Sequence, residues 1–208
     1  MTRAGFILAA ALGWVLVVAA ARATPLTRDL GDGLTYVRIR ELPADLPGGA
    51  AVPGQALILD LRYLVAGRDA AAALLAWAEF RASVRTPLFL LANRETGAEL
   101  NAALRRVSRG KGCVVIGVPG PGFEPHLTAK SEPAAEREAY AALERGEPVM
   151  SLLTENPGKV RLDEASLNHP PAEEEAPAAD SEKPAPPIDA ALQRAFHLHR
   201  SLRALRRM

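Results

Sequence analysis

The residues best suited to chemistry lie together in one short polar loop, residues 93–99 (NRETGAE). The loop follows an apolar run at 87–92 and precedes residues 99–107, where apolar side chains recur at helical spacing. A strand therefore leads through the loop into a helix, and in α/β sheets the carboxyl ends of strands are where ligands bind. Thr96 carries the only hydroxyl of the loop, so it is the candidate nucleophile.

A threonine nucleophile needs a base to accept its proton, and the candidates are Lys111 and Lys130. A second interpretation makes Glu95 and Glu99 an acid–base pair for a different hydrolysis. The same residue types also stabilise helix starts, where a threonine caps free amides and carboxylates complement the positive end of the dipole. We expect these structural roles, with Thr96 as the cap of the following helix.

Asp60 and Arg62 flank the end of a second apolar run, residues 56–61. Strand alternation places both side chains on one face, and a charge near a strand end needs a partner. The sequence therefore predicts an ion pair or bonds to the backbone here. His197 and His199 are two residues apart on a predicted helix, which does not suit a shared metal, and we predict neither a metal nor another cofactor.

Apolar runs and helical patterns alternate along the chain and predict an α/β fold with a mainly parallel sheet. An alternating pattern predicts a half-buried or edge strand at 34–40, with Thr35, Val37 and Ile39 on one face. The other predicted strands are 56–61, 87–92, 113–118 and a short one at 149–153; the predicted helices are 70–81 with Asp69 as its cap, 99–107, and 132–145.

Residues 31–122 resemble the C-terminal-processing, or tail-specific, serine peptidase family in three motifs. Asp60, Leu61 and Arg62 match the D-L-R sequence that closes a strand in that family, and VIGVPGPGF (115–123) matches its strand and glycine turn. The polar loop that carries the family's serine is matched, with a two-residue shortening, by Asn93, Thr96, Ala98 and Glu99. The resemblance implies a crotonase-like core of repeated strand–helix units and a groove that binds extended polypeptides.

The catalytic residues of that family are missing from the matching positions. No serine lies between Ser83 and Ser108, and residues 120–123 (GPGF) stand where the family's lysine base is expected. The sequence therefore predicts a noncatalytic domain that binds or scaffolds a polypeptide. The alternative is an active hydrolase of the same family, with Thr96 and Lys130 as its catalytic candidates. In either case the candidate binding residues are Asp60, Arg62, Asn93, Thr96 and Glu99.

Composition divides the chain into four parts. Residues 1–23 have a basic start, an apolar run and a small-x-small site, which predict a signal peptide, or a membrane anchor if it is not cleaved. We expect export to the periplasm or cell envelope, and a peptidase-like domain over 24–167. Residues 168–187 are rich in Pro, Glu and Ala and predict a disordered linker. The formal net charge of +1 argues against nucleic-acid binding.

The segment 188–208 is predicted to form a basic amphipathic helix that Asp189 caps. Its predicted apolar stripe consists of Ile188, Leu192, Ala195, Leu198, Leu202 and Leu205. We expect the stripe to dock on the parent domain, because a flexible linker keeps the helix at high local concentration. Contact of the helix with a membrane surface is the competing interpretation.

Overall fold

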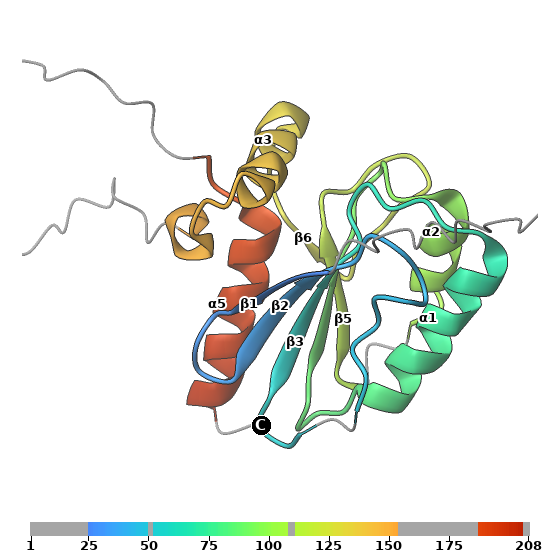
Figure 1. The fold of residues 1–208 in the computed structure, drawn as a ribbon, viewed down its shortest axis with the longest axis horizontal. Coiled ribbons are helices and arrows are strands. Elements are labelled where there is room, and N and C mark those ends of the chain that lie inside the picture. Colours follow the sequence, from blue (N-terminus) through green and yellow to red (C-terminus); the bar gives the residue numbers. More distant parts are fainter. Residues whose placement is uncertain (1–24, 50–51, 108–110, 154–186, 206–208) are drawn as a thin grey trace, which may run out of the picture.

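The computed structural model describes residues 25–49, 52–107, 111–153 and 187–205, which form one six-stranded sheet with helices on both faces (Figure 1). The strands lie side by side in chain order: β1 (Leu26–Asp29), β2 (Leu34–Arg38), β3 (Ala56–Asp60), β4 (Leu88–Leu91), β5 (Cys113–Gly117) and β6 (Leu127–Thr128). Strands β2 to β6 are parallel, and β1 pairs antiparallel with β2. The predicted α/β fold with a mainly parallel sheet is confirmed.

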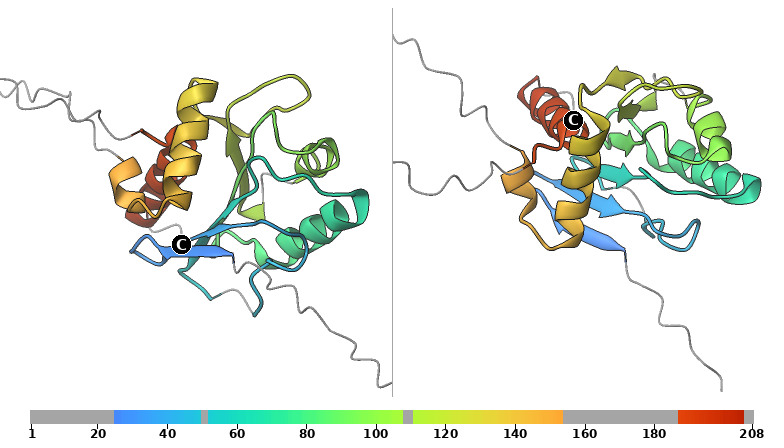
Figure 2. Two further views of the ribbon diagram at one scale, coloured as in Figure 1. Left: turned by 45° about the horizontal axis from the view of Figure 1, so that its top comes forward. Right: turned by 90° about the horizontal axis from the view of Figure 1, so that it is seen from above.

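Two layers of helices cover the sheet, as the views in Figure 2 show. On one face α1 (Arg68–Arg81) connects β3 to β4, and α2 (Ala98–Leu104) connects β4 to β5. The other face carries α3 (Pro133–Glu144), the 3₁₀ helix η2 (Val149–Leu152) and α5 (Ala190–Ala204). No helix in these described ranges is both long and apolar enough to cross a membrane.

The two faces of the sheet form two separate hydrophobic cores: the first lies under α1 and α2, and the second lies under α3, η2 and α5. Leu57, Leu59 and Leu90 point toward α1 and α2, whereas Ile58 and Phe89 point to the opposite face. Strands β3 and β4 are buried along their whole length, which explains why their sequences, apart from Asp60 at the end of β3, are continuous apolar runs rather than alternating ones. The core is therefore complete only when helices cover both faces.

Strand β2 is an interior strand with both faces covered, so the prediction of a half-buried or edge strand at 34–40 was wrong. Leu34, Val37 and Arg38 are all buried, although the assignment of alternate residues to the two faces was correct. The edge position belongs to β1, whose sequence LTRD has a single apolar residue and gives no alternating pattern. Because β1 covers the flank of β2, side chains that would be half-exposed at an edge are enclosed.

Several predicted local features differ from the structure. Helix α1 begins at Arg68 with Gly67 as its N-cap, and Asp69 lies in the first turn without a capping hydrogen bond. The segment predicted as a strand at 149–153 is the 3₁₀ helix η2. It lies beyond α3 and away from the sheet, where its buried Val149 and Leu152 pack into the second core instead of joining a ladder.

Helix α5 docks on the second face of the sheet, as expected for the C-terminal segment, and lies against β4 and β5. Asp189 is its N-cap, accepting a hydrogen bond from the Leu192 amide at 3.0 Å. The docked side is rotated from the predicted stripe, since Leu205 is exposed; the buried residues are Ala191, Leu192, Ala195, Phe196 and His199. The predicted signal peptide and residues 168–186 of the predicted linker lie outside the described residues.

Candidate functional site

Buried charged side chains gather where β2 and β3 end. Arg38, Asp60 and Arg62 are each 0% exposed, which is rare for residues of this kind because removing a charge from water is costly. Asp60 is the last residue of β3, and Arg62 follows it by two positions. The carboxyl ends of these parallel strands meet at one edge of the sheet, so the predicted pair lies at the expected place for a site.

Arg62 binds two carboxylates at once through the planar fork of its guanidinium. Its Nε and Nη2 donate to Asp60 Oδ1 and Oδ2 at 3.0 and 2.7 Å. Its Nη1 and Nη2 also donate to Asp189 Oδ1 and Oδ2 at 3.0 and 2.7 Å. Two bidentate pairs of this kind are the strongest geometry available to an arginine. The predicted ion pair of Asp60 and Arg62 is present, with Asp189 as a third member.

A second arginine extends the cluster toward helix α3. The Tyr36 hydroxyl donates to Asp60 Oδ2 at 2.7 Å and accepts from Arg38 Nε at 3.1 Å. Arg38 also donates to the Tyr140 carbonyl at 2.9 Å and lies 3.6 Å from the centre of the Tyr140 ring. The cluster thus attaches α3 through Tyr140 and α5 through Asp189 to the same end of the sheet.

The ionisation of the cluster follows from these contacts. Burial alone would raise the pKa of Asp60, but Arg62, Arg38 and the Tyr36 hydroxyl together outweigh it and lower that pKa below its ordinary value. Glu136 of α3 behaves in the opposite way, since burial and the nearby Asp189 carboxylate raise its pKa despite Arg62, 3.9 Å away. Its Oε1 is buried and has no hydrogen-bond partner. Folding therefore favours the charged form of Asp60 and the neutral form of Glu136.

We expect Glu136→Gln to stabilise the protein at neutral pH and to change little in acid. A carboxyl whose pKa is raised by folding stabilises the fold fully below its unfolded pKa, and this contribution is lost as the pH rises through the folded value. Glutamine is neutral at every pH, so the variant does not lose this contribution to stability as the pH rises. Urea unfolding at several pH values would measure the difference, with the exposed Glu138→Gln as control. Equal effects of the two variants at all pH values would contradict the assignment.

The polar loop after β4 is closed by its own hydrogen bonds. Asn93 Oδ1 accepts from the amides of Glu95 and Thr96 at 3.1 and 3.0 Å. Thr96 Oγ1 accepts from the Asn93 amide at 3.0 Å and donates to the Leu61 carbonyl at 3.2 Å. Thr96 therefore fastens the loop to the end of β3. It does not cap α2, whose N-cap is Gly97 without a side-chain bond, so that prediction was wrong.

The other candidate residues do not converge on Thr96. Lys130 is exposed, and no contact between it and Thr96 is found in the part of the chain that the structure describes. Lys111 precedes β5 at the amino end of the strand, whereas Thr96 follows the carboxyl end of the parallel neighbour β4. Glu95 pairs with Arg137 of α3, and Glu99 with the exposed Arg68 of α1. The two glutamates thus turn toward opposite faces of the sheet.

The arginines of the cluster can bind carboxylates, but the carboxylates that they bind belong to this same chain. Sequence reasoning found Asp60, Arg62, Asn93 and Thr96, which the structure places at neighbouring strand ends, and Glu99, which it places outside at the surface. It missed four members of the cluster: Tyr36, Arg38, Glu136 and Tyr140. Tyr36 and Arg38 could have been found from their spacing, because it places both side chains on one face of a strand. The buried thiol of Cys113 lies elsewhere, in β5, where burial raises its pKa to about 12.

Comparison of the chain with protein-family models, curated proteins and solved structures gave no match in any of the three. The candidate site therefore has to be interpreted from its own geometry and from the motifs in the sequence.

Proposed function

We propose that this protein is an exported, noncatalytic relative of the tail-specific peptidases, with a crotonase-like core, that binds or scaffolds a polypeptide in the cell envelope. The observation that carries the noncatalytic part is the state of Thr96. Thr96 is 3% exposed, and its hydroxyl is hydrogen-bonded to the backbone amide of Asn93 and the carbonyl of Leu61. A nucleophile needs a base within hydrogen-bond reach and an open path to the substrate, and Thr96 has neither among the described residues.

The filled cluster at the ends of β2 and β3 supports the same conclusion. In α/β enzymes this edge of the sheet is left open for substrate, but here Arg62 is saturated by Asp60 and Asp189. Asp189 belongs to α5, so the chain's own C-terminal helix occupies the position. The arrangement suits a structural role for this edge of the sheet, and a polypeptide would bind to another surface of the domain.

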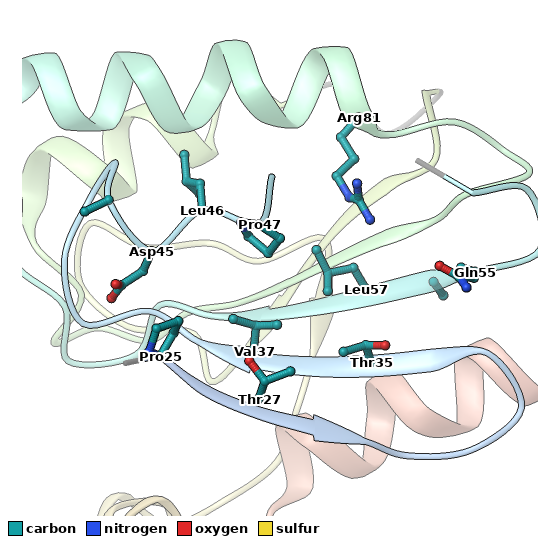
Figure 3. Close-up of a pocket in the computed structure, with 12 residues that line it drawn as sticks. Pro25, Thr27, Thr35, Val37, Asp45, Leu46, Pro47, Gln55, Leu57 and Arg81 are labelled. Atoms are coloured by element: carbon teal, nitrogen blue, oxygen red, sulfur yellow. The ribbon is translucent and has the colours of Figure 1, made fainter. Parts of the chain in front are cut away.

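A groove beside the edge strand offers such a surface for an extended polypeptide. It has a volume of about 310 Å³, and Figure 3 shows Thr27, Thr35, Val37 and Leu57 on the sheet side, opposite Leu46 and Pro47. Strand β1 pairs with β2 and has no second neighbour among the described strands. An exposed sheet edge next to a partly apolar groove is the usual arrangement for adding an extended peptide, because the backbone supplies hydrogen bonds and the groove receives side chains.

The test of the noncatalytic role uses Thr96→Val and an assay for cleavage of casein, an unstructured substrate. We expect no cleavage by either the wild type or the variant. We also expect the variant to lose about 1–3 kcal/mol of unfolding free energy, because the buried Asn93 amide then lacks its partner. Cleavage by the wild type that Thr96→Val abolishes would instead establish a hydrolase.

Polypeptide binding is tested separately with fluorescently labelled casein and measurement of anisotropy. We expect binding by the wild type and at least about tenfold weaker binding by Thr27→Trp, which fills the groove with a bulky ring. Ala76→Trp is the matched control, because it places the same ring in the groove between α1 and α2. Absence of wild-type binding, or equal weakening by both variants, would contradict the proposed surface.

A further inference from the structure

One end of the groove beside β1 carries a positive charge. Arg81, the last residue of α1, lines the groove and reaches from the helix toward the strand side, where Leu57 and Gln55 lie (Figure 3). The arginine is half-buried, so its guanidinium is partly shielded from water. Asp45 lies at the opposite end of the groove (Figure 3). The groove therefore has an apolar middle part between two charged ends.

The contacts of Arg81 leave its charge without a counterion. Its Nη1 donates to the Gly49 carbonyl at 3.5 Å, which is longer than the roughly 2.7–3.2 Å of ordinary hydrogen bonds between N–H and oxygen. The guanidinium carbon also lies 5.8 Å from the centre of the Trp77 ring. Neither partner is an anion, and the ion pairs among the described residues do not include Arg81. The groove thus offers a cation to whatever binds there.

The loop that forms the wall opposite the sheet is held in place by its own contacts. Asp45 Oδ2 accepts from the amides of Arg40 and Glu41 at 2.8 Å each, so this carboxylate already serves the backbone of the loop. Trp77 Nε1 donates to the Pro47 carbonyl at 3.1 Å and ties the loop to α1. Because this tryptophan precedes the arginine by four residues, both lie on the same side of the helix. The wall and the positive end of the groove are therefore positioned by one helix.

We infer that Arg81 selects polypeptides that carry an acidic side chain, an inference that rests on the proposed polypeptide groove. A strand bound in the groove displaces water from the guanidinium, and removing water from a charge is costly unless a counterion replaces it. A carboxylate does so with the paired hydrogen bonds that suit an arginine. Alternate side chains of an extended peptide point to the same side. An apolar side chain over Val37 and an acidic one beside Arg81 are therefore an even number of positions apart.

The test is calorimetric titration with peptides of alternating valine and serine, blocked at both ends, in which one valine is replaced by glutamate or by glutamine. We expect the wild type to bind the glutamate peptide about fivefold more tightly, and the ratio to fall as salt is added. Arg81→Gln should bind both peptides equally, and Arg81→Glu should prefer a peptide with lysine at that position. The matched control Arg68→Gln changes the first residue of α1 instead of the last and should keep the wild-type ratio.

Moving the glutamate by one position, in place of a serine, should remove the preference because the side chain then points away from the groove. Each ratio compares two peptides on one protein, so a variant's loss of stability does not imitate a loss of selection. Equal wild-type binding of the glutamate and glutamine peptides, while casein still binds, would overturn the selection by Arg81 and leave the groove. A wild-type ratio in Arg81→Glu would also overturn it and assign the arginine to the negative end of the helix dipole. Binding of neither casein nor peptides would overturn the proposed function as well.

Discussion

Arg62→Met is expected to lower the free energy of unfolding by about 3–5 kcal/mol. The variant leaves the carboxylates of Asp60 and Asp189 buried without their counterion, and the cost of breaking a buried ion pair on one side is of this size. Urea unfolding followed by circular dichroism measures the loss. The exposed Arg68→Met, whose side chain is 86% exposed in its ion pair with Glu99, should change stability by less than about 0.5 kcal/mol.

A second variant separates the charge from the packing of this cluster. Combining Arg62→Met with Asp60→Asn and Asp189→Asn removes both unpaired carboxylates and should recover part of the lost stability. The wild-type contribution of Asp60 also depends on pH. Because folding lowers the pKa of Asp60, its contribution is present above the unfolded pKa and is lost as the pH falls through the folded value. If Arg62→Met came within about 1 kcal/mol of the wild type at neutral pH, the cluster would not anchor the helices.

Truncation after Leu153 is expected to prevent stable folding. It removes α5 and uncovers the part of the second face of the sheet that α5 covers, where burial of Leu192 and Phe196 alone contributes about 3–6 kcal/mol. It also leaves Arg62 without Asp189. Total stabilities of domains are about 5–15 kcal/mol, so a loss of this size is decisive. The truncated chain should show no cooperative thermal transition by circular dichroism.

The control for truncation keeps α5 and removes the segment that leads to it. Leu152 and Asp189 are joined by a backbone hydrogen bond of 3.1 Å, so a short glycine bridge can replace residues 154–186 without moving either end. Shortening this connection should raise the unfolding free energy by about 1–2 kcal/mol, because less chain entropy is lost on closing the loop. A truncated chain that unfolds at the temperature of the bridged one would show that α5 is dispensable.

The parallel strands could be predicted because their signal is local. The runs at 56–61, 87–92 and 113–118 are apolar apart from Asp60, as expected of strands that are buried on both faces, and all three became neighbouring strands. Strand β1 was not predictable in this way, since LTRD forms a strand only because β2 offers it a partner. Segment 149–153 was wrongly predicted to be a strand for the opposite reason. Its local apolar pattern resembles that of a strand, but its apolar residues pack in a helix layer.

The candidate site was predictable only in the part that lies within a few residues of sequence. Asp60 ends β3 and Arg62 follows it by two residues, so the alternation expected at the end of a strand was enough to predict that they pair. Asp189 is 127 residues away from Arg62, and Tyr140 is 102 residues away from Arg38. No pattern in a single sequence specifies such pairs. The role of Asp189 as a helix cap could be predicted from the sequence. Its second role, as a partner of Arg62, depends on where α5 docks.

The long separation between Asp189 and Arg62 also determines when this domain can acquire its fold. Strands β1 to β6 pair with neighbours in chain order, so the sheet can assemble progressively as the polypeptide is synthesised. The part of its second face that α5 covers nevertheless stays open until residues 189–204 have left the ribosome. Until then the nascent chain exposes an apolar surface that chaperones can bind. The native state is complete only when α5, which is synthesised after all the strands that it covers, has docked.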